Sequence, residues 1–350
     1  MIETIELPDT PGGADDDVQF GRALVRAWRS DGIARVAMDP AHERAVRRAE
    51  TSSRRFFTQP TGFKSRFVSD LTYAGYVASG EQATGAAADY AEIFTVCQDI
   101  APDDPRVREH WPCHGPVPWP DTEYRRAFLA LADRLGDLGD RLLRLTALGL
   151  GLDDPDAFTG LAWGGWHHMR ALRFPPLSAR APRGAGARTD LGLLAIAVQN
   201  EVGGLCVRPP REGERRPRAW LPDESTDGMY ENEDPWTYVE PDPRVFLVFP
   251  GDVMDFVTDG TLSATPYKAL LTTHERFALL YSHAPNFQAC VRPLRERPDG
   301  DRGLHFGSHF TDAYLRAYPQ RVTTNRIVDE SRLSVLSELR RQAARSASRV

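Results

Sequence analysis

Two stretches in the first half of the chain repeat their apolar residues at the spacing of an α-helix. Within residues 17–32, apolar side chains fall at i, i+4, i+7 and i+8, which predicts an amphipathic helix that ends near Gly32. Within residues 124–152, apolar side chains step by three and four, which predicts a longer helix packed on a sheet. The positions that carry the two patterns are Phe20, Leu24, Ala27 and Trp28, then Phe128, Leu131, Leu135, Leu138, Leu142 and Leu145.

From Trp163 onward the pattern changes to short apolar runs separated by glycine and proline. Runs of this kind are typical of a β-sandwich or a barrel. The polar segment 211–236 interrupts them, and we expect it to form a surface excursion between two strands. The expected strands are residues 167–174, 191–199, 203–209, 244–251, 253–260, 267–273 and 276–285, with an earlier one at 33–38.

These elements predict a mixed α/β fold in a single domain that spans residues 1–350. Helices and flanking strands would occupy about residues 1–160, the barrel core about residues 161–290, and C-terminal helices about residues 308–350. The composition agrees with a globular protein, since 41% of the residues are hydrophobic and 26% are charged.

Charge and cysteine content exclude several classes of protein. A net charge of −6 provides no basic surface for nucleic acid. The four cysteines lack CxxC spacing, which argues against a zinc site or a disulfide framework and favours a reducing compartment. The acidic N-terminus has no apolar signal region, and no apolar run is long enough to span a membrane, so we expect a soluble cytoplasmic protein.

Charged and polar side chains stand in three of the strand-like stretches. Arg188 and Asp190 are two residues apart in "RTD", and side chains at i and i+2 leave the same face of a strand. Tyr267 lies in "SATPYKALL" and Arg276 in "HERFALLYSHAPN". Because a barrel could bring all four side chains to one mouth, the pattern predicts a binding or catalytic site there.

Several longer stretches resemble one known family. They include "FKSRFVSDLTYAGYVASGE", "EIFTVC", "GWHHMRALRFPP", "VGGLCVRPP", "ERFALLYSHAPNF" and "YPQRVTTNRI", and together they run over nearly the full length. The chain resembles the iron(II)/2-oxoglutarate-dependent oxygenases of the isopenicillin N synthase-like group, and within it the ethylene-forming subgroup. The resemblance implies a double-stranded β-helix, or jelly-roll barrel, flanked by N-terminal and C-terminal helices.

The resemblance also implies a metal site from which this chain departs. In the family, a His-Thr-Asp stretch and a Thr-Pro-His stretch supply two histidines and an aspartate that hold Fe(II). Arg188 stands at the first histidine and Tyr267 at the second, so Asp190 is the one matching ligand. A guanidinium has no lone pair to donate, and it repels a cation. We therefore expect Arg188 to pair with Asp190 in place of the metal, no cofactor to be required, and Fe(II) not to bind.

The remaining histidines give only a minor alternative, a relocated metal site. The family has the same histidine pair as His167 and His168 beside its intact triad, so this pair does not replace the lost ligands. Neighbouring side chains on a strand face opposite ways, so at most one of the two histidines points into the barrel. His274 and His283 lie on the predicted strand of Arg276. A histidine there more often makes hydrogen bonds within the protein or lies at the surface than binds a metal.

Arg276 matches the family arginine that binds the distal carboxylate of 2-oxoglutarate. We expect a retained pocket for 2-oxoglutarate or a similar carboxylate, with neutralisation of an internal carboxylate as the alternative. In the ethylene-forming subgroup the neighbouring residues hold L-arginine, but here the glutamate that attracts its guanidinium is lost, so an anionic small molecule is the expected ligand. The substrate positions are Gln82, Leu191 and Ala317, which differ from the subgroup, then Thr84, Arg170 and Arg316, which match it, with His168 beside them.

Three functions follow from these residues. The first is metal-independent, non-redox chemistry on an anionic small molecule, such as cyclisation, isomerisation, elimination or decarboxylation. Arg188 would stabilise an oxyanion, Tyr267 would act as acid or base, and Asp190 would orient Arg188 or take a proton. The second is a catalytically dead ligand-binding protein or partner of an active oxygenase subunit. The third is an Fe(II)/2-oxoglutarate oxygenase with an altered coordination sphere.

Overall fold

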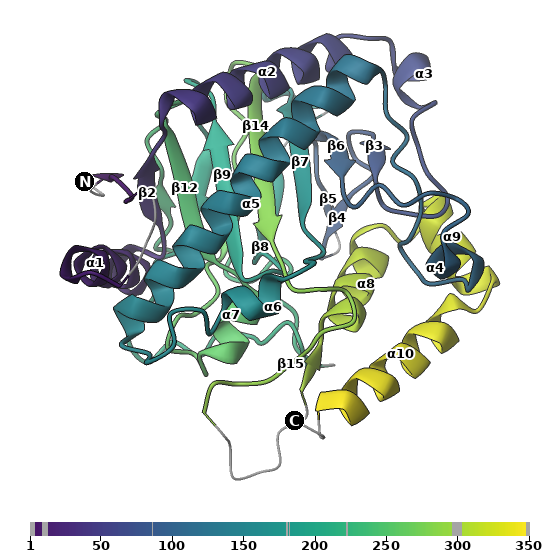
Figure 1. The fold of residues 1–350 in the computed structure, drawn as a ribbon. Helices are drawn as coiled ribbons and strands as arrows, with labels where there is room; N and C mark the ends of the chain where they lie inside the picture. Colours follow the sequence, from purple (N-terminus) through teal and green to yellow (C-terminus); the bar gives the residue numbers. More distant parts are fainter. Residues whose placement is uncertain are drawn as a thin grey trace.

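The structure, a computed structural model, packs helices around two β-sheets (Figure 1). One long helix crosses the outer face of the larger sheet, and further helices from the C-terminal part lie on the side of the molecule away from the N-terminus. The structure describes residues 4–8, 13–85, 87–179, 181, 183–221, 223–295 and 303–347.

The N-terminal layer contains three long helices, α1 (Asp15–Asp31), α2 (Pro40–Phe57) and α5 (Thr122–Leu150). The prediction that the first helix ends near Gly32 is confirmed. Gly32 caps α1 at a φ of 73°, in the left-handed region that glycine adopts without a steric penalty. Short helices α3 (Thr61–Lys64), α4 (Pro105–Arg108) and α6 (Thr159–Ala162) lie in the connections.

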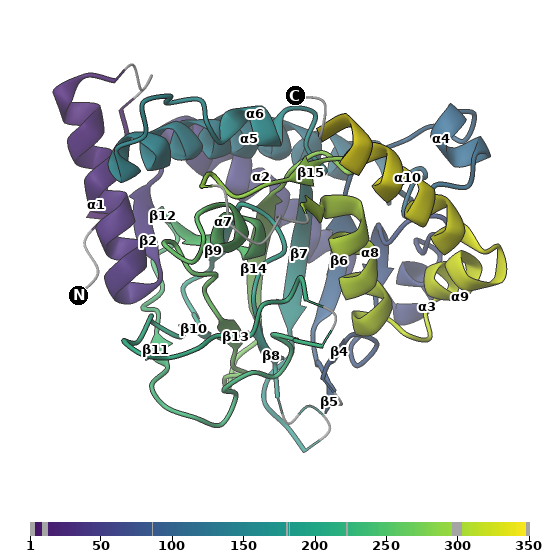
Figure 2. The ribbon, with the colours of Figure 1, turned by 90° about the horizontal axis from the view of Figure 1, so that it is seen from below.

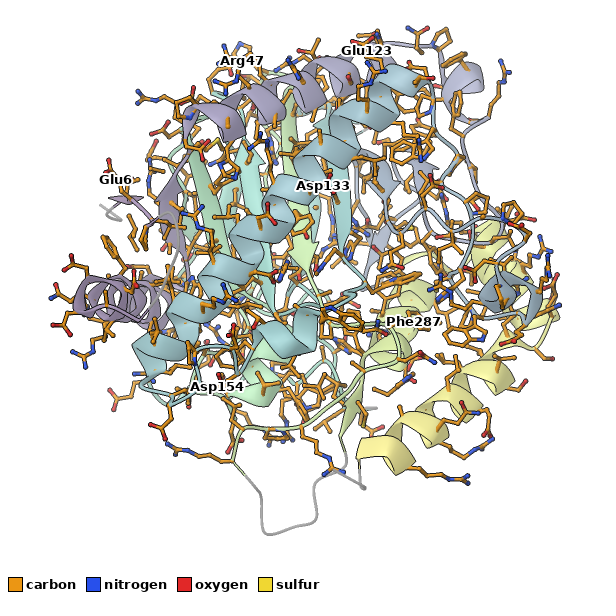
Figure 3. All side chains as sticks on the ribbon, viewed as in Figure 1. Glu6, Arg47, Glu123, Asp133, Asp154 and Phe287 are labelled. Carbon is orange, nitrogen blue, oxygen red and sulfur yellow. The ribbon has the colours of Figure 1, made fainter. Side chains whose placement is uncertain are left out.

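The predicted long amphipathic helix is confirmed by α5. The Asp121 side chain caps its first turn by accepting a hydrogen bond from the Tyr124 backbone N–H at 2.8 Å. The inner side of α5 buries its row of leucines, while Glu123 and Asp133 lie on its outer side (Figure 3). The apolar face therefore fixes the orientation of α5 on the sheet.

Eight strands form the larger sheet, and all its pairings are antiparallel except β1 with β2. Every residue of the central strand β9 is buried, because one face packs under α5 and the other faces the barrel interior. In spatial order the strands are β1 (Thr4–Ile5), β2 (Ala34–Ala37), β12 (Val245–Pro250), β9 (Leu194–Gln199), β14 (Arg276–His283), β7 (His168–Phe174), β6 (Glu92–Val96) and β3 (Gly75–Val77).

Four shorter strands form the second sheet, which closes the other side of the jelly-roll barrel. They are β11 (Thr237–Tyr238), β10 (Leu205–Val207), β13 (Tyr267–Ala269) and β8 (Ala185–Arg188). The predicted mixed α/β fold with a double-stranded β-helix is therefore confirmed. Two further pairs are β4 (Ala83–Thr84) with β5 (Ala87–Ala88), and β15 (Cys290–Val291) with β16 (Leu304–His305).

One predicted strand is wrong. Residues 253–260 begin in helix α7 (Asp252–Val257) rather than in a strand. The backbone N–H of Asp252 donates to the Asp190 carbonyl at 2.7 Å, which anchors the first turn of α7. A short apolar run is compatible with a buried helix as well as with a strand. Here the backbone contact with a distant turn favours the helix.

The segment 211–236 lies between β10 and β11, as predicted, but it is more than a surface excursion. Ala219, Thr226 and Met229 are buried, and the first two line a cavity described below. The C-terminal part adds α8 (Phe306–Ala317), α9 (Val322–Asp329) and α10 (Arg332–Ala347).

No helix among the described residues is long and apolar enough to cross a membrane. The four cysteines are all free thiols. The division of the chain near residues 160, 290 and 308 within one domain stays a prediction.

Candidate active site

Two adjoining cavities lie inside the barrel and at its mouth. The inner cavity lies between the two sheets and is lined mainly by apolar side chains. The outer cavity is bounded by α8, which lies beside β4 (Figure 2), and by segment 211–236. The residues that line both cavities are Gln82, Arg170, Arg188, Tyr267 and Leu280.

Arg188 does not form the predicted ion pair with Asp190. It is the last residue of β8, so Asp190 lies beyond the strand and the i, i+2 rule no longer places both side chains on one face. The Arg188 guanidinium instead pairs with the Asp89 carboxylate and donates to the Thr84 hydroxyl. Burial alone would lower the pKa of Arg188, but the charge and hydrogen bond of Asp89, together with Tyr267, outweigh burial and raise it.

Asp89 is a site residue that sequence reasoning missed. It is 1% exposed and accepts hydrogen bonds from the side chains of Gln82, Thr84 and Arg183 and from the Gly186 backbone N–H, at 2.7 to 3.1 Å. Burial alone would raise the pKa of Asp89, but these donors and Arg188 lower it, so the carboxylate is charged. The only sequence signal was a lone aspartate just before a buried strand.

Asp190 is buried without a cation. It is 5% exposed, and its Oδ1 accepts hydrogen bonds from the Ser282 hydroxyl at 2.7 Å and the Gly192 backbone N–H at 2.9 Å. No basic side chain in the described part of the chain forms an ion pair with it. Burial raises the pKa of Asp190 to about 6 despite these two donors. A single buried carboxylate can supply one ligand to a cation, but it does not form a metal site by itself.

Tyr267 faces Arg188 directly across the antiparallel pair of β13 and β8. Its ring packs on Phe249 with the ring centroids 5.3 Å apart. Burial raises the pKa of Tyr267, and the neighbouring Asp190 charge raises it further, so the phenol is neutral. A neutral phenol at this place can donate a proton or a hydrogen bond to a bound molecule.

Arg276 points into the inner cavity without an acidic partner among the described residues. It is 2% exposed, its Nε donates to the Leu270 carbonyl at 3.2 Å, and its Nη2 has no hydrogen-bond partner there. The guanidinium carbon lies 3.7 Å from the Phe174 ring centroid. Burial lowers the pKa of Arg276 to about 10, which leaves it charged at neutral pH. The alternative that Arg276 neutralises an internal carboxylate therefore has no partner in the described chain.

Arg170 is a second cation in the shared wall. It donates to Gln82 Oε1 at 3.2 Å and to the hydroxyls of Tyr314 and Tyr318 at 3.2 and 3.1 Å, and its Nε is unpartnered in the described part of the chain. No acidic side chain described by the structure pairs with it. Burial alone would lower the pKa of Arg170, but the surrounding tyrosines raise it.

The other predicted substrate positions divide into two groups. His168, Leu191, Arg316 and Ala317 line the outer cavity, as a substrate role requires. Thr84 lines neither cavity, because its hydroxyl is used by Asp89 and Arg188. Gln82 lines both, but it is held by Asp89, Arg170 and Tyr318.

The histidines point in the directions that strand geometry predicts. His168 faces the outer cavity, and its buried Nδ1 has no partner among the described residues. His167 faces away and stacks on His283, with the ring centroids 4.4 Å apart, and His274 bonds to Thr273. Within the described residues, no three His, Cys, Asp or Glu side chains form a metal-binding group.

The fold and the arginine-lined inner cavity define an oxygenase-type barrel, and sequence comparison agrees. Residues 2–122 match the family model "non-haem dioxygenase in morphine synthesis N-terminal". The chain is 51% identical over 342 residues to the 2-oxoglutarate-dependent ethylene/succinate-forming enzyme of Ralstonia nicotianae, covering 97% of this chain and 99% of that protein. The chain therefore belongs to the 2-oxoglutarate-dependent oxygenase family, close to the ethylene/succinate-forming enzyme.

Solved structures share the fold at low sequence identity. A 2OG-Fe(II) oxygenase family protein of Caulobacter crescentus aligns with a TM-score of 0.67 and 21% identity over 89% of this chain and 99% of that chain. JOX2, solved with 2OG, Fe and JA, aligns with a TM-score of 0.64 and 21% identity over 91% of this chain and 87% of that chain.

These findings overturn the prediction that no cofactor is required and that Fe(II) does not bind. The relative at 51% identity is named for its dependence on 2-oxoglutarate, and JOX2 holds both 2OG and Fe. The physical premise was also wrong, because Arg188 pairs with Asp89 and does not occupy the carboxylate of Asp190.

Proposed function

We propose that this protein is a 2-oxoglutarate-dependent oxygenase that binds 2-oxoglutarate in the inner cavity and an anionic small molecule in the outer cavity. The observation that carries the proposal is the isolated, buried guanidinium of Arg276. A buried cation without a partner is costly, and a carboxylate that accepts two parallel hydrogen bonds removes that cost.

The charges around the outer cavity support an anionic substrate. Arg170 has no acidic partner in the described chain, and Arg316 has only a long contact, 3.8 Å, with Asp227. The acidic group nearest to Gln82 is Asp89, which already satisfies two arginines. A guanidinium ligand such as L-arginine would meet unpaired positive charge there, whereas a carboxylate or phosphate would be attracted.

Asp190 is the one family ligand present that would hold Fe(II), because the described residues contain no group of three His, Cys, Asp or Glu side chains that could bind a metal ion. If bound, iron would let O₂ convert 2-oxoglutarate to succinate and CO₂, with one oxygen atom entering succinate and the other oxidising the substrate. Few protein donors face this position, and an α-keto acid brings two oxygens of its own. We therefore infer that metal binding depends on 2-oxoglutarate, which distinguishes this site from a complete three-residue metal site.

Residues of the chain would then orient the substrate and transfer protons to or from it. Arg170 and Arg316 would bind the anionic group, and the neutral Tyr267 phenol would donate a proton or a hydrogen bond where negative charge develops. Arg188, opposite Tyr267, would stabilise the same charge. The half-buried Leu191 and Ala317 side of the cavity would exclude water.

Arg188 and Tyr267 face each other and can stabilise charge and transfer a proton. This pair also supports a second candidate function, in which the bound anion is converted without redox chemistry by cyclisation, isomerisation, elimination or decarboxylation. Anaerobic turnover without release of succinate would favour it. Ligand binding with no turnover would instead favour a binding protein or an oxygenase partner subunit.

The test is 2-oxoglutarate binding by calorimetry, with Mn²⁺ present, to the protein and to Arg276→Gln. We expect the variant to bind at least ~30-fold more weakly, the loss of about 2 kcal/mol that removal of a charged hydrogen-bonding partner causes. Arg244→Gln, which changes an exposed arginine, is the control and should bind normally. Equal affinity in Arg276→Gln would contradict the proposal.

A further inference from the structure

We propose that a groove between α2 and α5 binds a short linear phosphate chain, such as the chain of a nucleoside triphosphate or of inorganic polyphosphate. The groove lies on the outer side of the larger sheet, where α5 crosses it (Figure 1), so this site is independent of the function proposed above. Five arginines line the groove: Arg44, Arg47 and Arg48 from α2, and Arg126 and Arg134 from α5.

The protein leaves most of this positive charge without a counter-ion. All five arginines are exposed, and all except Arg47 form no ion pair within the described part of the chain. Arg47 has only a long contact, 3.9 Å, with Glu43. Glu123 lies on the same face of the molecule as Arg47 (Figure 3) and lines the groove, but its carboxylate already binds Arg55. The groove is therefore a concentrated cationic site on a chain whose net charge is −6.

The spacing of the arginines suits a ligand with several negative charges in a row. Each residue of an α-helix adds ~1.5 Å, so Arg44 and Arg48 lie ~6 Å apart along α2, and Arg126 and Arg134 lie ~12 Å apart along α5. Arginine can bind a phosphate group through two parallel hydrogen bonds. A single phosphate group would satisfy only one or two of these guanidinium groups, whereas a chain of phosphates would contact both walls.

The floor of the groove favours a phosphate chain over a protein segment or single-stranded nucleic acid. It consists of small side chains, among them Ala45, Ser52, Ala127 and Ala130. A protein partner gains most of its affinity from large apolar or aromatic anchors, and the bases of a single strand stack on aromatic side chains. The described residues that line the groove include no large apolar or aromatic side chain.

Acidic side chains beside the groove favour a short ligand over a long one. Asp133 and Asp137 are exposed on α5, and Glu43 lies in the first turn of α2. A long polyanion such as duplex DNA would extend past the arginines and meet these carboxylates, whereas a chain of about three phosphates would stay among the arginines.

The experiment measures binding of tripolyphosphate and of ATP by calorimetry, without divalent cations and at low ionic strength, where exposed charges are little screened. We expect Arg48→Gln/Arg126→Gln, which changes one arginine in each wall, to weaken tripolyphosphate binding at least ~10-fold. Arg108→Gln/Arg341→Gln, which changes two exposed arginines of α4 and α10, removes the same charge and is the matched control. It should bind within about twofold of the unaltered chain.

The two ligands distinguish the sources of the phosphate chain. Equal affinities would show that the phosphates alone are recognised, and tighter binding of ATP would assign the groove to nucleotides, so either result supports the proposal. The proposal is overturned if tripolyphosphate does not bind, if inorganic phosphate binds equally tightly, or if an acidic peptide or duplex DNA binds more tightly than both ligands.

One further variant separates the groove from the mouth of the barrel, which is also cationic. Arg316→Gln changes the outer cavity and should leave tripolyphosphate binding unchanged. If Arg316→Gln loses this binding while Arg48→Gln/Arg126→Gln retains it, the groove proposal is overturned and the proposed anionic substrate site is not. Failure of 2-oxoglutarate binding, in contrast, would count against the proposed function alone.

Discussion

The Nε2 of His309 lies 3.0 Å from the Oδ2 of Asp252, and this contact ties α8 to the turn that carries Asp190. Asp252 is fully buried, and its backbone N–H donates to the Asp190 carbonyl at 2.7 Å. One wall of the outer cavity and the turn that carries Asp190 are thus joined through this side-chain contact.

Removal of that contact should destabilise the protein. In His309→Phe the ring volume is retained, but the Asp252 carboxylate loses its side-chain partner, which should lower the free energy of unfolding by about 2–4 kcal/mol. Urea denaturation measures this change. Asp252→Asn keeps an acceptor for His309 and should cost less, so an equal loss in both variants would contradict this account.

Gly204 leaves room for Arg276. A Cβ at this position would lie 2.7 Å from the Arg276 Nε, and the φ of Gly204 is +118°. Gly204→Ala should therefore shift Arg276 and weaken 2-oxoglutarate binding about tenfold or more, measured by calorimetry. Gly213→Ala is the matched control, because Gly213 also has a positive φ, +76°, but nothing lies within 4 Å of its Cβ. Normal binding by Gly204→Ala would show that Arg276 does not anchor the ligand.

Tyr267→Phe separates catalysis from binding. The Tyr267 hydroxyl makes no hydrogen bond within the described part of the chain, and the Phe ring retains the packing on Phe249, so stability should change little. Turnover, followed as succinate formed from 2-oxoglutarate, should fall by ~10², the usual size of acid or base assistance. Unchanged turnover would mean that Tyr267 only fills space.

The buried ring of His114 should make stability depend on pH. Burial lowers the pKa of His114 to about 4, and its Nδ1 contacts the Pro112 carbonyl at 2.7 Å. In the unfolded chain the histidine pKa is near ~6.5, so the unfolded chain takes up a proton at a higher pH than the folded protein does. The free energy of unfolding that neutral His114 contributes above pH ~6.5 is therefore lost as the pH falls towards 4. His114→Phe should remove up to about 3 kcal/mol of this loss, measured by denaturation between pH 7 and 4. Exposed His274→Gln should leave the profile unchanged.

Periodicity and resemblance predicted the parts of the fold whose pattern is local. The apolar stripe of α5 and the glycine that ends α1 act within one element, so the sequence contains the whole signal. Helix α7 was missed because its first turn is fixed by a carbonyl of a distant turn rather than by its own pattern.

The sequence indicated which residues line the candidate site, but it did not indicate which of them contact each other. Arg276 lines the inner cavity and Asp190 lines the outer cavity. The partner of Arg188 could not be predicted, because strand β8 ends at Arg188 and because Asp89 is 99 positions away in the sequence. A contact between such distant residues depends on the closed barrel, which no local pattern encodes.

Whether Fe(II) binding depends on 2-oxoglutarate can be measured by an anaerobic calorimetric titration with Fe(II), with and without 2-oxoglutarate. We expect tight Fe(II) binding only when 2-oxoglutarate is present, and we expect Asp190→Asn to lose that binding. Tight binding without 2-oxoglutarate, or no binding with it, would contradict the account.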